Sequence, residues 1–265
     1  MLSSDVNQVQ PILQRDPIWS VYAIADLQPA FAPYCHWSVI NGAQGEAVIL
    51  LFTALQPPIL FATGDDQAVV AALTAIPLPE RVYVTLQPRH LALVSEYYTW
   101  VEEAHPMVRM VLAKDIQITM PEMSTLVRLQ PTDAAAITDL YRQGGPFTPD
   151  YFDPYQLDDG IFYGVKDVQD NLVAVGGTHV IAQQEGMGAI GNMYTHPAQR
   201  GKGYARAVLG AIIAELQARN VTTIVLNVDE RNTTARGLYE RYGFTPYCTF
   251  IEAEGVRKVV ESKVF

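Results

Sequence analysis

The chain has 265 residues, and its 18 Lys and Arg residues against 28 Asp and Glu residues give a formal net charge of −10 at pH 7. This balance argues against an extended nucleic-acid surface and against an anionic membrane as partners, because both need clustered cations. The composition, 49% hydrophobic and 17% charged, is typical of a globular chain with one large domain or two of ordinary size.

Targeting segments and metal sites are not predicted. No apolar run approaches the about 20 residues that a membrane helix needs, and residues 1–15 lack the apolar segment of a signal peptide, so we expect a cytoplasmic location. The two cysteines, Cys35 and Cys248, form no CxxC pair, and the five histidines form no HxxxH pair. These spacings disfavour a disulfide framework and a zinc site.

The first half of the chain, residues 1–122, is predicted to alternate strands and helices. Apolar runs and periodicity indicate a helix at 65–75 and strands at 47–55, 59–62, 81–86 and 108–113. This half has no glycine-rich loop and no nucleophile motif, so we assign it no chemistry. The segment 114–124 is mixed in polarity and holds Pro121, and we expect a boundary here that leaves residues 123–265 as a second domain.

The second half predicts an α/β fold. Strands are expected at 125–129, 161–166, 172–182, 189–195 and 221–228, and helices at 133–142, from Gly203 to Asn220 and from Asn232 to Gly243. The long helix has one apolar face, because its apolar residues recur at helical spacing from Ala205 to Leu216. The stretch 144–160 has neither a helical nor a strand period, and loops of this length are often functional.

The most informative motif joins the strand at 189–195 to the long helix through Arg200, Gly201, Lys202 and Gly203. A helix N-terminus carries about half a positive charge and up to four unpaired amide donors. The glycines leave those amides unshielded, and the two cations add full charges. Strand, basic glycine loop and helix together predict an anion site suited to a pyrophosphate. The motif is neither a Walker loop nor GxGxxG.

This half of the chain resembles the GNAT superfamily of acetyl-coenzyme A dependent N-acetyltransferases. RGKGYA (200–205) is similar to the pyrophosphate motif of that family, and NTTARGLYERYGF (232–244) is similar to the helix that ends in its LYxxxGF signature. GGTHV (176–180) with GNMYTHP (191–197) resembles a two-part subgroup. The resemblance implies a mixed, mainly antiparallel twisted sheet flanked by helices, with a second, degenerate GNAT-like domain at the N-terminus.

The resemblance also implies which residues bind acetyl-CoA, the expected donor. Backbone groups of three strand residues would bind the pantetheine arm, and the glycine loop would bind the pyrophosphate. Gly191 would form the bulge that separates this strand from its neighbour, and Asn232 would both contact the coenzyme and cap its helix. The expected cofactor-binding residues are Met193, Tyr194, Thr195, Arg200, Gly201, Lys202, Gly203, Tyr204, Ala205 and Asn232.

The resemblance implies one proton-transfer role, and the attack of an amine requires a second. Tyr239 is implied as the general acid that protonates the departing thiolate, since a phenol has a pKa near 10 in water; a core position is the alternative, because its helical spacing also suits packing. The strand at 189–195 lacks the Glu that many relatives place there. His179 is therefore the candidate base, with a hydrogen-bonded structural histidine as the alternative, and Asn192 is expected to orient a water that relays the proton.

The acceptor is expected beside the irregular loop, where aromatic and acidic side chains suit a cationic amine; a solvated loop anchored by its rings is the alternative. We predict that Phe152 and Tyr155 contact the acceptor. The other residues of these kinds in the loop are Phe147, Asp150, Tyr151, Asp153, Asp158 and Asp159.

We therefore predict direct transfer of an acetyl group to a primary amine, in a small molecule or a peptide, within a ternary complex. No cysteine lies in the motif region to carry the acyl group. The alternatives are N-acylation of an amino acid such as glycine with a longer acyl-CoA, and an acyl-CoA binding or sensor module without catalysis. The N-terminal half is expected to shape the acceptor pocket or an oligomer interface, for instance that of a homodimer.

Overall fold

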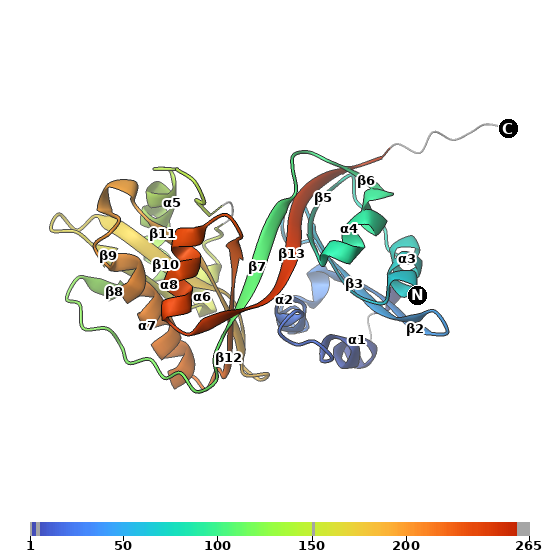
Figure 1. The fold of residues 1–265 in the computed structure, drawn as a ribbon, viewed down its shortest axis with the longest axis horizontal. Coiled ribbons are helices and arrows are strands. Elements are labelled where there is room, and N and C mark those ends of the chain that lie inside the picture. Colours follow the sequence, from blue (N-terminus) through green and yellow to red (C-terminus); the bar gives the residue numbers. More distant parts are fainter. Residues whose placement is uncertain (1, 4–5, 150–151, 259–265) are drawn as a thin grey trace. The chain divides into compact units, whose positions relative to one another are not determined.

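The computed structural model describes residues 2–3, 6–149 and 152–258. Contacts divide the chain into unit 1, residues 1–108 with 248–265, and unit 2, residues 109–247 (Figure 1). Each unit is a mixed α/β structure with a mainly antiparallel open sheet. The division expected from the sequence, 1–122 and 123–265, differs from these units, chiefly because the last strand pairs within unit 1. Within the described ranges, no helix is long and apolar enough to cross a membrane.

Unit 1 is organised around the strands β2 (Cys35–Gly42), β3 (Gly45–Phe52), β4 (Ile59–Gly64) and β5 (Arg81–Leu86), with β13 (Phe244–Arg257) beside β5. β2, β3 and β4 are antiparallel, β5 is parallel to β4, and residues 251–256 of β13 are antiparallel to β5. β3 is buried from Ala47 to Phe52, as its unbroken apolar run predicts. The other elements are β1 (Leu2–Ser3), α1 (Val6–Leu13), α2 (Val21–Ala25), the 3-10 turn η1 (Ala32–Tyr34), α3 (Asp66–Ala75), α4 (Pro88–Ser95), β6 (Tyr98–Trp100) and the start of β7 (His105–Leu112).

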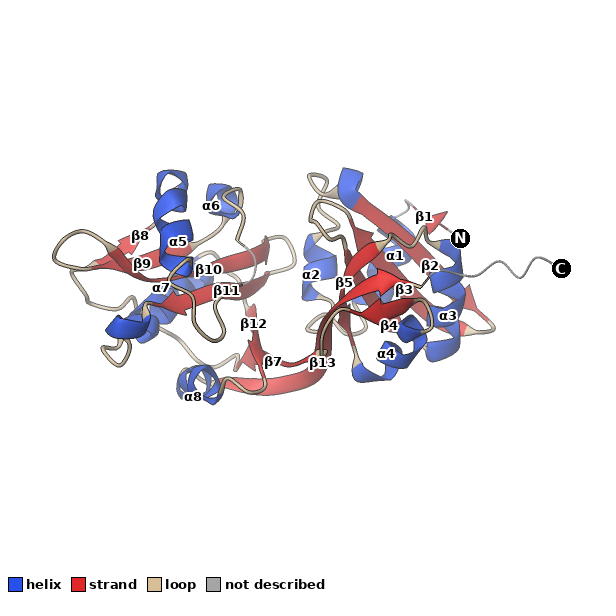
Figure 2. Ribbon diagram, turned by 90° about the horizontal axis from the view of Figure 1, so that it is seen from above, coloured by secondary structure: helices blue, strands red, loops and turns tan. Residues whose placement is uncertain are grey.

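Unit 2 contains β8 (Leu126–Arg128), β9 (Phe162–Lys166), β10 (Leu172–Ala182), β11 (Met187–Thr195) and β12 (Thr223–Asp229). The first four strands pair antiparallel in sequence order, and β12 is parallel to β11. The connection from β11 to β12 is α7 (Tyr204–Ala218), which packs against β9, β10 and β11 (Figure 2). The remaining elements are the 3-10 turns η2 (Pro131–Asp133) and η3 (Pro197–Gln199) and the helices α5 (Ala134–Tyr141), α6 (Gln156–Asp159) and α8 (Thr233–Arg241).

The two units share one order of elements. In each, three antiparallel strands lead through a helix to a strand parallel to the third, and a second helix follows: β2–β3–β4–α3–β5–α4 in unit 1 and β9–β10–β11–α7–β12–α8 in unit 2. The connections before the first helix differ. Asp65 alone separates β4 from α3, and Asp66 lies in the first turn of α3, so this helix start repels anions. In unit 2 the connection is basic and eight residues long, 196–203.

The apolar face predicted for the long helix is confirmed. Its residues Val208, Leu209, Ile212, Ile213 and Leu216 are fully buried in α7. Four helices are missed by the sequence patterns: α1, α2, α4 and the single turn α6 inside the stretch 144–160. All four are too short to show a clear helical period, and their boundaries depend on tertiary packing.

An ion pair connects α7 to the edge of the unit 2 sheet. Arg128 Nε on β8 donates to Glu215 Oε2 on α7 at 2.9 Å, and its other nitrogens donate to the carbonyls of Leu129, Phe162 and Gly160. Burial raises the pKa of the Glu215 carboxyl, but hydrogen bonds and charge, those of Arg128 foremost, outweigh this and hold the pKa below its usual value.

The Arg128→Leu variant is predicted to lower the free energy of unfolding by about 1–3 kcal/mol, because it removes the Arg128 hydrogen bonds from the partly buried Glu215 carboxylate, which keeps Arg219 and Tyr163 as donors, and from three backbone carbonyls. Arg142→Ala, which removes an exposed pair with Asp139, should cost less than about 1 kcal/mol. The depressed pKa of Glu215 contributes stability above its ordinary value of 4.5 that is lost as the pH falls through the folded-state pKa. The measurement is urea unfolding at several pH values. A difference in free energy of unfolding between Arg128→Leu and the native chain that did not narrow in acid would contradict this account.

Candidate active site

The site begins where β11 and β12 part. Their parallel pairing runs from Met187 and Thr223 to Ile190 and Leu226 and then stops. β11 continues along β10 alone, as far as Thr195. In the described part of the chain no strand pairs with the other edge of this last segment, so an extended ligand can lie along it as an added strand.

Alternation along β11 decides which backbone groups face that edge. The His196 amide donates to the Val173 carbonyl of β10 at 2.9 Å. Because backbone groups of alternate residues point the same way, those of Tyr194 also face β10, and those of Met193 and Thr195 face the unpaired edge. Of the three residues expected to offer backbone groups, Tyr194 is therefore the least suited. Its hydroxyl instead donates to the Gly144 carbonyl at 2.6 Å.

The bulge in β11 lies at Asn192 and not at Gly191. The register with β10 changes between the pairs Gly177–Gly191 and Val175–Tyr194, which leaves one extra residue on β11. Asn192 has a φ of 56°, whereas Gly191 is not among the residues with positive φ. The expectation for Gly191 is thus corrected by one position, because asparagine tolerates the left-handed region better than most residues.

Gly191 is required for a different reason: a side chain at this position would collide with the His179 ring. A β-carbon at Gly191 would lie 2.1 Å from His179 Nε2, so the imidazole rests directly on the Gly191 backbone. A second register change, between Thr178 and Val180, makes His179 the extra residue of β10. The expectation that the strand of His179 neighbours β11 is confirmed.

His179, which is partly exposed, and the buried Asn192 and Gln156 form a polar cluster beside the bulge. Burial lowers the pKa of His179, and its hydrogen-bonding interaction with the Asn192 side chain partly opposes that shift. Asn192 is 4% exposed, and its Nδ2 donates to Gln156 Oε1 at 3.2 Å. Its Oδ1 is buried and has no hydrogen-bond partner among the described residues. The cluster therefore combines an imidazole favoured in its neutral form with a buried acceptor oxygen.

The basic loop ends at the exposed start of α7. Gly201 and Gly203 both have a φ of 80°, and β-carbons there would meet nothing within 4 Å. Gly203 is the N-cap of α7 and provides no side-chain cap. The first amide bonded to a helical carbonyl is that of Ala207, to Gly203. In the described structure the amides of residues 201–206 have no protein acceptor, so they are available to an anion.

The two cationic side chains of this loop form hydrogen bonds within the loop or with the adjacent end of β11. Arg200 Nε donates to the Thr195 carbonyl at 3.2 Å, and Lys202 Nζ donates to Gln199 Oε1 at 2.6 Å. Tyr204 and Ala205 are partly exposed in the first turn of α7. The cations pair with neutral oxygens in these contacts, so their charges add to the positive field at the helix start.

Tyr239 lies on the buried side of α8. Its side chain is 6% exposed, and its ring meets that of Phe244 edge-on at 6.1 Å. Burial raises the pKa of Tyr239 to about 12, and the described residues offer its hydroxyl no hydrogen bond.

Asn232 caps α8, as predicted, by accepting from the Ala235 amide at 3.1 Å. Tyr242, the C-cap of α8, donates from its hydroxyl to the Arg206 carbonyl at 2.6 Å, which joins the end of α8 to the first turn of α7.

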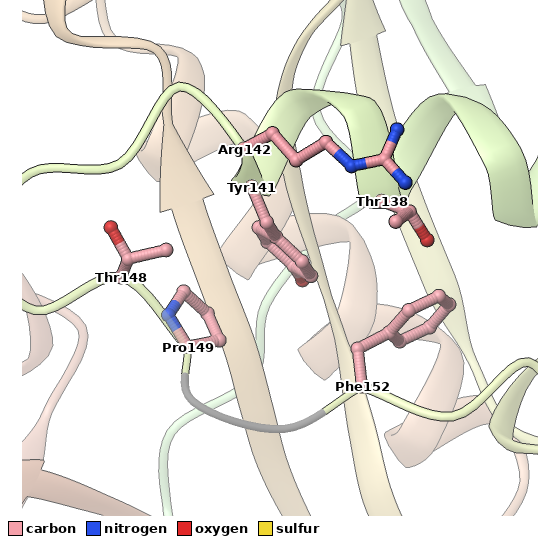
Figure 3. A pocket seen from close by; sticks show the side chains of 6 residues that line it. All are labelled: Thr138, Tyr141, Arg142, Thr148, Pro149 and Phe152. Atoms are coloured by element: carbon pink, nitrogen blue, oxygen red, sulfur yellow. The ribbon is translucent and has the colours of Figure 1, made fainter.

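The loop after α5 borders a shallow hollow of about 300 Å³. It is lined by Thr138, Tyr141, Arg142, Thr148, Pro149 and Phe152 (Figure 3). Phe152 packs edge-on against Tyr141 and Phe162, in both cases at 5.9 Å, so its ring also anchors the loop. Tyr155 is 44% exposed and does not line the hollow, and no carboxylate is among its described lining residues. Asp150 and Tyr151 lie outside the described residues.

Two residues of the site escape prediction from the sequence. Tyr141 donates from its hydroxyl to the Asn192 carbonyl at 2.8 Å, and burial raises its pKa. Gln156 accepts from Asn192. Neither belongs to a motif, and their roles come only from the contact of the α5–β9 connection with the bulge.

The Gly191→Ala variant is predicted to displace the His179 ring. It should lower the free energy of unfolding by about 1–3 kcal/mol, as overpacking does, and shift the ring resonances of His179. Gly42→Ala is the matched control, because its new methyl would meet nothing within 4 Å. Unchanged His179 resonances in Gly191→Ala would contradict the stacking described above.

Comparison with known proteins agrees with this geometry. Residues 133–244 match the model of the Acetyltransferase (GNAT) family. A mycothiol acetyltransferase from Thermobispora bispora is 45% identical over 78 residues, which are 28% of this chain and 26% of that protein. A ribosomal protein bS18 alanine N-acetyltransferase from Haemophilus ducreyi is 36% identical over 76 residues, 29% of this chain and 50% of that protein. The chain thus spans half or less of these curated relatives.

The fold is shared over a longer stretch. A GNAT family structure from Novosphingobium aromaticivorans aligns with a TM-score of 0.61 and 18% identity, and covers 92% of this chain and 97% of that one. The residues that match the family model, 133–244, include the unpaired edge of β11, the start of α7, and α8. The match to the Acetyltransferase (GNAT) family therefore lies in residues 133–244 of this chain.

Proposed function

We propose that the protein transfers the acetyl group of acetyl-CoA, the donor of GNAT acetyltransferases, to the nitrogen of a primary amine by direct attack. The observation that carries the proposal is the start of α7, where residues 201–206 present amides without protein acceptors directly after a strand with an unpaired edge. Few other ligands combine a diphosphate with an extended amide-bearing arm. The two features therefore fit one ligand.

The protein groups suit coenzyme A at both ends. The open space around Gly201 and Gly203 admits phosphate oxygens to the amides, and Arg200 and Lys202 add charge. The backbone groups of Met193 and Thr195 would pair with the amides of the pantetheine arm. Bound there, the thioester supplies an activated acetyl group.

His179 is the proposed general base. An amine is mostly protonated at neutral pH and must lose a proton before it attacks. The lowered pKa of His179 keeps the imidazole neutral and able to accept that proton, directly or through a water held by Asn192. The absence of a carboxylate from β11 leaves His179 as the titratable group at the bulge.

Tyr239 is the proposed general acid. Its pKa of about 12 keeps the phenol protonated across the neutral range, and its hydroxyl lacks a competing protein acceptor. It can therefore donate to the thiolate that leaves. The packing of its ring on Phe244 is compatible with this role, because a buried ring fixes the direction of the hydroxyl.

The acceptor is a separate part of the proposal. The two relatives carry names with different acceptors, mycothiol and an alanine of a ribosomal protein, so we propose the shared chemical class, a primary amine.

Unit 1 repeats the element order of unit 2 but has an acidic helix start, which supports the interpretation of a degenerate copy without coenzyme. A cytoplasmic location and a homodimer remain predictions. A non-catalytic acyl-CoA sensor is the second candidate, favoured by the missing carboxylate.

Tyr239→Phe is predicted to bind CoA as the native chain does and to lose about 10²–10⁴-fold in kcat, the usual contribution of a positioned acid. Tyr242→Phe removes a hydroxyl from the same helix and should keep turnover. The assay is thiol release from acetyl-CoA with a panel of primary amines, with binding measured by calorimetry. Equal rates for Tyr239→Phe and the native chain would remove Tyr239 from the mechanism.

Lys202→Ala is predicted to weaken CoA binding about tenfold, the loss expected for one charge-assisted contact. The effect should shrink at high salt. Lys166→Ala removes an exposed lysine paired with Asp170 and should leave the Kd unchanged. Calorimetry that finds the same Kd for all three proteins would exclude the loop as the phosphate site.

A further inference from the structure

Polar hydrogens are scarce in the hollow beside the loop after α5. Thr138 Oγ1 donates to the Ala134 carbonyl at 3.0 Å, and Thr148 Oγ1 donates to the Gly145 carbonyl at 2.8 Å. The third hydroxyl of the described lining, that of Tyr141, donates to a carbonyl of β11 at 2.8 Å. A hydroxyl has a single hydrogen, so these three hydroxyls have none left for a ligand.

The guanidinium of Arg142 is the exception. Its Nη1 donates to Asp139 Oδ1, and with the described residues its side chain forms no other hydrogen bond. A guanidinium has five N–H bonds, so several remain for a ligand. Asp139 does not belong to the described lining of the hollow, and neither does any other carboxylate. The described lining therefore carries one positive charge with free donors, which suits an anion.

The hollow lies beside β11. The Tyr141 ring meets that of Tyr194 on β11 edge-on at 5.6 Å, and the Tyr141 hydroxyl bonds to the Asn192 carbonyl at the bulge. Figure 3 shows the rings of Tyr141 and Phe152 and the Arg142 side chain around one space. A ligand group held by Arg142 would therefore lie close to the bulge, beside which the proposed base is found.

We propose that the hollow binds a carboxylate of the acceptor through Arg142, and that the protein thereby selects primary amines that also carry a carboxylate. The inference rests on the proposed function and adds to it an acceptor class and a specificity residue. Arg142 would touch the substrate, and Asp139 would act through Arg142 by competing for one of its nitrogens.

A carboxylate fits this site better than a phosphate does. A guanidinium and a carboxylate pair through two parallel N–H bonds, and their charges cancel. A phosphate monoester carries a charge of about −1.5 to −2 at neutral pH, which a single arginine leaves partly uncompensated. The volume of about 300 Å³ is at the lower end of small-molecule sites, roughly 300–1,000 Å³, so we expect a small acceptor.

The binding arm of the test uses benzoate and benzylammonium with the full chain saturated with CoA, which occupies the proposed anion site at α7. Benzoate is expected to shift the backbone amide resonances of Thr138 and Thr148, and benzylammonium is expected to shift them much less. The benzoate shifts should vanish in Arg142→Ala and persist in Arg81→Ala, which removes an exposed arginine paired with Glu254. Equal shifts with both probes, no shift with benzoate, or benzoate shifts that persist in Arg142→Ala would overturn the proposal.

The turnover arm compares the best amino acid of a panel with the amide of the same acid. Arg142→Ala should raise KM for the acid about tenfold, the loss expected for a charge-assisted pair, and leave KM for the amide unchanged. Arg142→Lys keeps the charge without the fork and should be intermediate. Asp139→Asn releases Nη1 and should lower KM for the acid, an effect that a merely structural ion pair would not produce. CoA binding should be native-like in all of them.

The two proposals fail in different ways. Benzoate shifts that depend on Arg142, without turnover of any amine, would refute the transferase and leave the carboxylate site standing. Turnover with a preference between acid and amide that is the same in Arg142→Ala, Asp139→Asn and the native chain would refute the carboxylate site and leave the transferase standing.

Discussion

The parting of β11 from β12 after the Ile190–Leu226 pair is the constraint on which the rest of the site depends. β10 remains paired with the end of β11, so Met193 and Thr195 stay in the strand although, among the described residues, no strand pairs with their other edge. The bulge at Asn192 and the ring of His179 lie at the same point. The connection from β11 then reaches the start of α7 within eight residues. The divergence of these two strands thus positions the groups that we propose bind the pantetheine arm and the phosphates and accept the proton.

Local charge, and not the overall charge, decides what this site can bind. The chain is acidic, with a net charge of −10, yet its proposed anion site combines the dipole of a fifteen-residue helix with two cations. Unit 1 shows the contrast within the same molecule. In unit 1 the corresponding helix, α3, begins with Asp65 and Asp66, and two carboxylates at a helix start disfavour phosphate binding. The element order alone therefore does not make a coenzyme site.

Much of unit 2 is predictable from the sequence, because its signals are local. The apolar period of α7, the Asn232 cap and the glycine at the end of α8, which has a φ of 88°, each depend on a few neighbouring residues. The bulge at Asn192 is not predictable to the residue, since its position is set by the register with β10. Gln156 and Tyr141 join the site through contacts 36 and 51 residues away, and no spacing within a motif reports such contacts. Unit 1 carries no motif, and its shared topology appears only in the strand pairing.

Amide hydrogen exchange with and without CoA tests the central claim most directly. The account predicts that added CoA slows exchange of the amides from 201 to 206, and also of those of Met193 and Thr195, which the pantetheine arm would cover. Protection confined to other segments, or unchanged exchange across the loop and the free edge of β11 under saturating CoA, would contradict it.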